Sequence, residues 1–134
     1  MAIVKDETKE MSLMDESYEA DGDLSALENC VIMPSAQSSG RMKVKAPTGQ
    51  GVLPAGVLLN APTDTQLAEV REMGIAKIKA NGAFNAGIEL AIAATTGKVA
   101  AAASGDWVVG ISREAASAAN HLVSVRLTSP YQLN

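Results

Sequence analysis

The chain has 134 residues, a formal net charge of −4 and 47% hydrophobic residues. A length of this order accommodates one domain with a hydrophobic core, not two. The single cysteine, Cys30, excludes an internal disulfide, and no apolar run approaches the roughly 20 residues of a membrane-spanning helix. We therefore expect a protein that is made in a reducing cytoplasm and has no membrane partner.

Small side chains dominate the apolar part of the composition. Alanine occupies 23 positions, whereas aromatic residues make up only 3% of the chain. Because burial stabilises a fold by roughly 25 cal/mol per Å² of apolar surface, an alanine-rich core gains little free energy per residue. The composition therefore favours a protein that is stabilised by assembly with itself or with a partner.

The N-terminal segment is strongly acidic. Residues 1–28 hold nine acidic and two basic side chains, a charge of −7, and the remaining chain carries +3. This asymmetry predicts an acidic arm, residues 1–28, attached to a body, residues 29–134. The spacing of residues 11, 14 and 18 fits one face of a short helix. The segment is either a disordered tail or an arm that lies across a neighbouring subunit. Its apolar side chains are the expected partner contacts: Ile3, Val4, Met11, Leu13, Met14 and Tyr18.

From Cys30 onward the sequence consists of short runs with the residue pattern of β-strands, beginning with "CVIMP". In "RMKVKAP", residues 41–47, polar and apolar residues alternate, which predicts a strand. Met42, Val44 and Ala46 would then point inward. The outward-facing bases are further expected partner contacts: Arg41, Lys43 and Lys45. After a turn at "PTGQG", "GVLLNAP" is an apolar strand stopped by Pro62.

The segment "LAEVREMGIAKIKA", residues 67–80, alternates over its whole length. We predict one long bent strand or two strands, with a bulge or bend at Gly74. A helix capped by Thr63 or Asp64 is the less favoured alternative, since the alternation continues to Ala80. Asn81-Gly82 predicts a tight turn at positive φ that leads into the next strand.

Four further runs complete the set of strands: "GIELAIA", "KVAAAA", "DWVVGIS" and "HLVSVRL". Between the last two, "REAASAAN", residues 113–120, predicts a helical turn or two. About eight short strands, with a turn signal every eight to twelve residues, are typical of a small antiparallel β-barrel or sandwich. The predicted fold class is all-β.

No pattern in the sequence predicts catalysis. His121 is the only histidine, and Cys30 has no basic neighbour in sequence that would lower its pKa. No glycine-rich phosphate loop or set of zinc ligands is present. We therefore expect no enzyme activity, no cofactor and no metal. Aromatic residues for base stacking are nearly absent and the arm would repel phosphate, so nucleic acid is not an expected partner.

One short motif supports an alternative function. Met42-Lys43-Val44, followed by Ala46-Pro47, resembles the hairpin on which biotinyl and lipoyl carrier domains present a modified lysine. In this alternative the chain is a carrier or binding module and Lys43 is the modified residue.

The order of the segments resembles a known family. "VLPAGVLLNAP", followed by "AEVREMGIAKIKANGAFNAGIELAIAATTGKVAAAASGDWVVGISREAASAANHLVSVRL", is similar to the small cement or decoration proteins of tailed-phage capsids. The shared series covers residues 52–127, more than half of the chain. It departs from the family pattern at Ser112-Arg113, where Ala-Leu is usual, and the arm lies outside it.

The resemblance implies a β-rich structural protein of the virion. Such proteins bind the outer surface of the capsid and stabilise junctions between major capsid protein subunits, commonly as homotrimers. The implied partners are the major capsid protein and further copies of the chain, after synthesis in the host cytoplasm. The resemblance also implies no catalysis and no cofactor.

Overall fold

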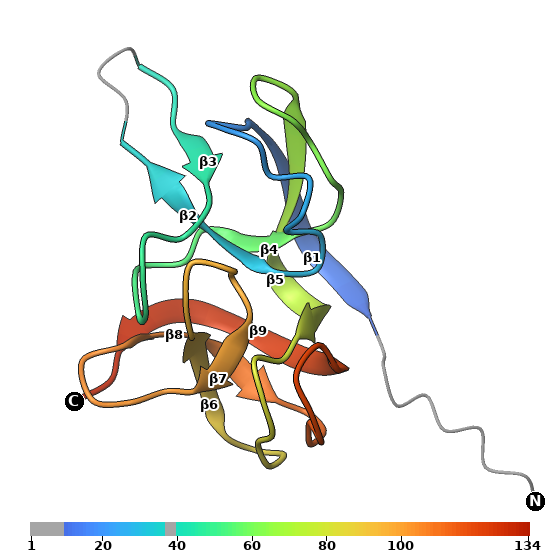
Figure 1. Cartoon of the computed structure of the whole chain (residues 1–134), viewed down its shortest axis with the longest axis vertical. Helices are drawn as coiled ribbons and strands as arrows, with labels where there is room; N and C mark the ends of the chain where they lie inside the picture. Colours follow the sequence, from blue (N-terminus) through green and yellow to red (C-terminus); the bar gives the residue numbers. More distant parts are fainter. Residues whose placement is uncertain (1–9, 37–39) are drawn as a thin grey trace, which may run out of the picture.

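The computed structural model describes residues 10–36 and 40–134. Within these ranges the chain forms β-strands and no helix, so the predicted all-β class is confirmed (Figure 1). The strands are β1 (Met11–Glu19), β2 (Val31–Ser35), β3 (Lys43–Lys45), β4 (Gly56–Leu58), β5 (Leu67–Lys79), β6 (Glu89–Ile92), β7 (Val99–Ala101), β8 (Trp107–Ser112) and β9 (Leu122–Gln132).

The strands form one curled antiparallel sheet, in the order β3-β2-β4-β5-β9-β8-β6-β7. Strand β5 is the longest, with 13 residues. Arg71 of β5 lies opposite Asp15 of β1 and also opposite Val57 of β4, so β1 and β4 occupy opposite edges of β5. Ile75 similarly lies between Met11 of β1 and a residue of β9. Consequently β1 covers one edge of β5, while β4 and β9 follow one another along the other edge.

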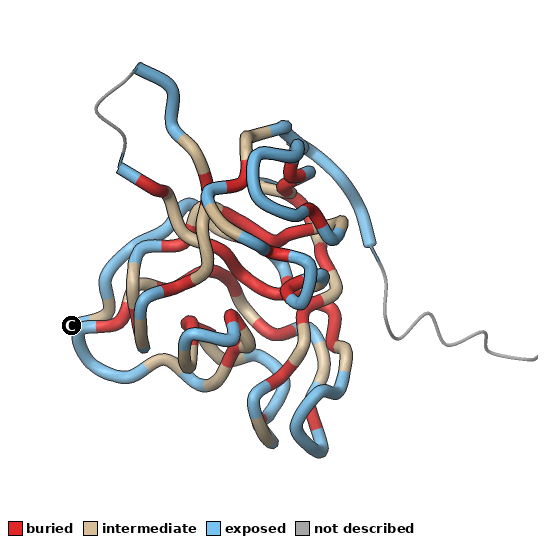
Figure 2. Tube along the Cα trace, turned by 45° about the horizontal axis from the view of Figure 1, so that its top comes forward, coloured by how far each residue is buried: buried red, intermediate tan, exposed pale blue. Residues whose placement is uncertain are grey.

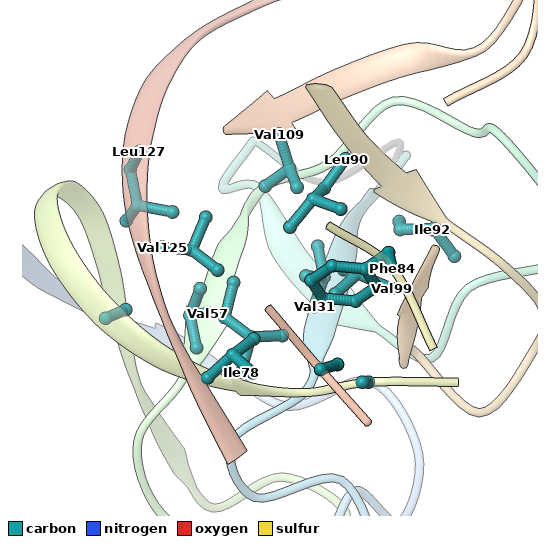
Figure 3. Close-up of a cluster of buried hydrophobic side chains, with 14 residues drawn as sticks. Val31, Val57, Ile78, Phe84, Leu90, Ile92, Val99, Val109, Val125 and Leu127 are labelled. Carbon is teal, nitrogen blue, oxygen red and sulfur yellow. The ribbon is translucent and has the colours of Figure 1, made fainter. Parts of the chain in front are cut away.

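The buried side chains form two clusters, and adjacent residues of β2 and of β4 belong to different clusters, so the clusters lie on opposite sides of these strands. Figure 2 marks the buried residues along the chain, and Figure 3 shows the first cluster. The first gathers residues from β2, β4, β5, β6, β7, β8 and β9 around Phe84, and its large members include Val31, Val57, Ile78, Leu90, Ile92, Val99, Val109, Val125 and Leu127. The second is smaller and contains Ala20, Leu24, Leu27, Cys30, Ile32, Val44, Leu58, Ala68 and Val70. Aliphatic side chains supply nearly all of this burial, as the composition indicated.

Part of the acidic segment belongs to the second cluster. Ala20 and Leu24 are essentially inaccessible to solvent, and Leu27 is only 9% exposed. The backbone N–H of Leu24 also donates to the carbonyl of Pro62 at 2.9 Å. Residues 20–28 are therefore packed on the remainder of the fold, although charge alone grouped them with the arm.

The helix expected around residues 11–18 is wrong. Met11–Glu19 is a strand that pairs with β5, and its register shifts between Ser12 and Met14 and again between Met14 and Asp15. These irregularities change which side of the strand successive residues face. That shift explains why the apolar residues of the segment do not follow a period of two.

The predicted irregularity at Gly74 is confirmed: strand β5 continues through this residue, but its backbone takes an unusual conformation. Gly74 has a φ of +114°, and a Cβ atom there would lie 2.1 Å from the carbonyl oxygen of Met11. Only glycine allows the two strands to approach so closely in this conformation. The register shift in β1 lies directly beside this contact.

Three further local predictions are wrong. Residues 81–82 form a bend, but neither Asn81 nor Gly82 has a positive φ, and β5 pairs with β9 instead of forming a hairpin with β6. Residues 113–120 form a loop, because Ala116 pairs with Phe84 and Asn120 takes a φ of +68°. Met42 was expected to point inward but is 42% exposed.

Candidate docking surface

Strand β1 places the predicted apolar contact residues in different environments. Met11, Leu13 and Met14 are 46%, 66% and 39% exposed and remain available to a partner. Tyr18 is half-buried against the second cluster, and its hydroxyl donates to Glu72 Oε2 at 2.8 Å. Burial, followed by the hydrogen bond and negative charge of Glu72, raises the pKa of Tyr18 to about 12. Ile3 and Val4 lie outside the described residues.

The predicted basic contacts lie in and before β3. Arg41 is exposed, whereas Lys43 and Lys45 are half-buried. Lys43 Nζ lies 2.7 Å from Glu19 Oε2, and this interaction raises the pKa of Lys43. The structure therefore joins the acidic segment to the basic strand within one chain. Between the two lysines, Val44 points inward as predicted and is fully buried.

The geometry of Lys43 differs from that of a carrier lysine. A carrier presents its lysine at the tip of a hairpin, where a ligase can reach the amine. Lys43 instead begins strand β3, pairs in register with Ser35 of β2 and holds the carboxylate of Glu19.

A hollow of about 310 Å³ lies beside the exposed methionines of β1 and β5. We call it the methionine groove, and it is lined by Met14, Pro34, Met42, Pro54, Ala55, Gly56, Glu72, Met73, Val109, Leu127, Thr128, Ser129 and Pro130. Met14 and Met73 are direct partners in the β1–β5 pairing. Most of the wall is therefore apolar and carries adaptable methionine side chains.

The groove arises where β4 and β9 separate along β5. β4 pairs with β5 as far as Arg71, and β9 begins to pair at Ile75, which leaves Glu72, Met73 and Gly74 between them. Residues 128–130 bulge out of β9 opposite Val109, because the β8–β9 register shifts between Val108 and Gly110. Two breaks in strand pairing thus open the wall of the sheet at one place.

A second, more polar hollow of about 350 Å³ adjoins the methionine groove at Met42. Its lining combines Ser17, Tyr18, Glu19, Arg41, Met42, Lys43 and Leu67. Leu67 is 62% exposed, so this hollow also offers apolar contact area. The two hollows together form the candidate docking surface: an apolar groove beside a more polar hollow, in which Lys43 and Glu19 are paired with each other and Arg41 is exposed.

Sequence reasoning missed the groove. Its walls come from seven separate stretches of the chain. These stretches meet only in the folded structure, around the gap between β4 and β9. Half of the six methionines of the chain line it, which is the signal that composition could have offered. The alternation in residues 41–47 predicts that Met42 points into the core, whereas Met42 is exposed and lines both hollows.

Cys30 and His121, the two residues considered as catalytic candidates, lie in ordinary structural environments. Cys30 is buried, as expected for an inert thiol, and burial raises its pKa. His121 Nδ1 accepts a hydrogen bond from the backbone N–H of Ser117 at 3.2 Å. Across residues 10–36 and 40–134, no three His, Cys, Asp or Glu side chains gather as a metal site, and no helix could cross a membrane.

Comparisons with known proteins relate the chain to others through its fold. The sequence matches no protein-family model and no curated protein sequence. The structure is similar to the crystal structure of the N base of the head fiber protein gp8.5 of bacteriophage phi29, with a TM-score of 0.68 and 15% sequence identity. This similarity covers 90% of the chain and 98% of the phi29 protein chain. At this identity, what the two chains share is the fold.

Proposed function

We propose that this chain is a structural protein of a bacteriophage virion, which binds the outer surface of the capsid and stabilises junctions between major capsid protein subunits. The observation that carries the proposal is the shared fold with the base of a phage head fiber, over 90% of this chain. The ordered series of segments that resembles capsid decoration proteins supports the same assignment independently of the fold comparison.

The candidate docking surface supplies a physical mechanism. Filling an apolar groove of about 310 Å³ with a shell side chain or loop would remove apolar surface from water on both partners. Methionine side chains adapt to the shape of an apolar partner, which suits contacts at a junction between subunits. Because such a protein binds only the assembled shell, mass action shifts the equilibrium toward the intact shell.

We further propose that the protein acts as a homotrimer on the shell. The alanine-rich core favours additional buried area between copies, and closed rings are the usual form of soluble homo-oligomers. The number three comes from the family resemblance. Light scattering of the purified protein is expected to give three times the mass of the chain. A monomer both in solution and on shells would contradict the trimer.

Residues of the acidic segment complete the proposed partner surface. Met11, Leu13 and Met14 are exposed on β1, and Ile3 and Val4 precede them in the chain. We propose that these apolar side chains contact the shell or a sister subunit. Exposed ion pairs contribute only about 0–1 kcal/mol each, so apolar contact must supply most of the affinity.

The experiment that tests the function is binding of purified protein to shells that lack it. Met42→Glu places a charge in the groove, and we expect its dissociation constant to rise about tenfold or more, as for a hot-spot residue. Leu53→Glu is the matched control, because Leu53 is similarly exposed, at 40%, and does not line the groove. Equal affinity of Met42→Glu and the wild type would exclude the groove from the contact. Failure of the wild type to bind any shell would overturn the function itself.

A further inference from the structure

Strand β1 contributes very little to the hydrophobic core. Seven of its nine residues are exposed and the last two are half-buried, whereas every even-numbered residue of β5 from Ala68 to Ile78 is buried except the half-buried Glu72. Its apolar side chains, Met11, Leu13 and Met14, face solvent instead of the interior. Tyr18 is the exception, since it is half-buried against the second cluster and donates to Glu72; over the rest of β1, burial of side chains does little to hold the strand in place.

Charge-assisted contacts and backbone pairing supply that attachment. Arg71 on β5 holds Asp15 through two hydrogen bonds, from Nε to Oδ1 at 2.9 Å and from Nη2 to Oδ2 at 3.2 Å. Its Nη1 also donates to Glu10 at 3.2 Å and to the carbonyl of Ile75 at 3.1 Å. The Arg71 side chain is only 11% exposed, so its charge needs a carboxylate partner.

Weaker contacts continue along the strand. Lys77 Nζ lies 3.8 Å from Glu10, and Ser17 Oγ donates to Glu69 at 2.7 Å. The attachment changes abruptly at the end of β1, because Ala20 is fully buried and pairs with Val44. Elements with few buried apolar contacts open at low free energy, and this boundary marks where such an opening would stop.

We propose that β1 is a releasable strap, and that its release presents the edge of β5 from Leu67 to Ile75 as an acceptor for an extended strand of another protein chain. Strand addition at an open sheet edge is a general mode of recognition, in which the backbone supplies affinity and side-chain pairs supply specificity. This inference does not depend on the phage assignment.

The edge itself defines the chemistry of the incoming strand. In the closed chain Asp15 lies opposite Arg71, and Met14 lies opposite Met73. A partner strand must therefore place a carboxylate against Arg71, with an apolar side chain immediately before it to meet Met73. A strand without the carboxylate would leave a largely buried guanidinium unpaired. β1 is thus the internal stand-in for the partner.

Titration of the strap follows from its neighbours. The hydrogen bond from Arg71 lowers the pKa of Asp15, so the strap is stabilised above the ordinary pKa of aspartate and is weakened as pH falls through the lowered value. The other charged groups in contact with β1 are Glu69 and Glu72 on β5 and Lys43 on β3. Lys77 on β5 faces Glu10 just before the strand, and Asp21 and Asp64 in the adjoining loops act on Lys43. The carboxylates of β1 itself are Asp15, Glu16 and Glu19, and Glu10 immediately precedes it.

Hydrogen exchange measured by mass spectrometry on the full chain tests the independent opening. Asp15→Asn is expected to speed exchange in residues 11–19 and 67–75 about tenfold, the factor of a 1.4 kcal/mol change, and to leave β6 and β8 unchanged. Glu16→Gln is the matched control on the same strand, because Glu16 makes none of the contacts with Arg71, and no change is expected. At a pH below the lowered pKa of Asp15, the wild type should approach Asp15→Asn after correction for intrinsic exchange. Uniform acceleration of all strands, or none, would overturn the strap.

A second experiment tests the acceptor edge. A fluorescent peptide with the sequence of residues 10–19 is added to the full-length protein, and fluorescence anisotropy reports binding. Asp15→Asn protein should bind this peptide more tightly than the wild type does, and a peptide carrying asparagine in place of the aspartate should bind at least tenfold more weakly. In a Cys30→Ala background, Met14→Cys with Met73→Cys joins directly opposite residues, and the oxidised protein should take up no peptide. Equal uptake by the oxidised and reduced protein would show that the peptide binds elsewhere.

Discussion

At the scale of single residues, the contact between β1 and β5 depends on the missing side chain of Gly74. The position combines a φ of +114° with the Met11 carbonyl oxygen 2.1 Å from where a Cβ would lie. The obstacle is backbone, so it cannot be relieved by rotating a side chain. The sequence marked Gly74 as a bend, but the reason that a side chain is excluded lies in a residue more than sixty positions away.

We expect Gly74→Ala to lower the free energy of unfolding by about 1–3 kcal/mol, because it combines a strained backbone with a steric clash. Urea denaturation followed by circular dichroism measures this change. Gly82→Ala is the control, since Gly82 has no positive φ and open space around its Cβ position. Its effect should stay within about 0.5 kcal/mol. Equal stabilities of the two variants would contradict the close approach at Gly74.

Tyr18 gives a residue-scale prediction about pH. Its pKa is raised to about 12, so the folded chain keeps the phenolic proton to higher pH than the unfolded chain does. The contribution of Tyr18 to stability is therefore complete below pH 10, the ordinary value, and is lost as pH rises toward 12. Titration by ultraviolet absorbance should show a tyrosine transition near pH 12 that disappears in Tyr18→Phe. A Tyr18→Phe titration identical to that of the wild type would refute the assignment.

At the scale of elements, alternation predicted the strands well where one face is buried. β5 shows this most clearly, since its even-numbered residues other than Glu72 are buried and its odd-numbered residues are not. β1 could not be predicted in the same way, because its side chains are exposed and a bulge interrupts its period. Pairing partners were also inaccessible to local patterns: β5 joins β9 across more than forty residues instead of forming the expected hairpin.

In the acidic segment, residues 20–28 combine acidic side chains with the buried Leu24 and Leu27, so this part of the segment belongs to the folded body. We expect Leu24→Ala to cost about 2–5 kcal/mol, as for other buried leucines. Leu13→Ala, at a residue 66% exposed on β1, should change stability by no more than about 0.5 kcal/mol. Thermal unfolding of the two variants makes the comparison. A small effect of Leu24→Ala would mean that residues 20–28 are dispensable for the fold.

At the scale of the whole molecule, a curled sheet with a thin aliphatic core leaves its most adaptable apolar side chains at the surface. Met14, Met42 and Met73 meet in a groove that only the folded topology creates. Composition indicated the need for a partner, and the structure shows where contact area is available. The candidate docking surface could not be located from sequence because its residues are brought together by two breaks in strand pairing, at Arg71–Ile75 and at residues 128–130.

The central claim is that this fold decorates the outside of a phage shell. Cryo-electron microscopy of phage capsids that bind the purified protein, imaged with and without it, tests this proposal most directly. We expect added density on the outer surface at junctions between major capsid subunits, with three copies around each site and the methionine groove facing the shell. Density inside the shell or confined to the tail, or no added density at all, would contradict the claim.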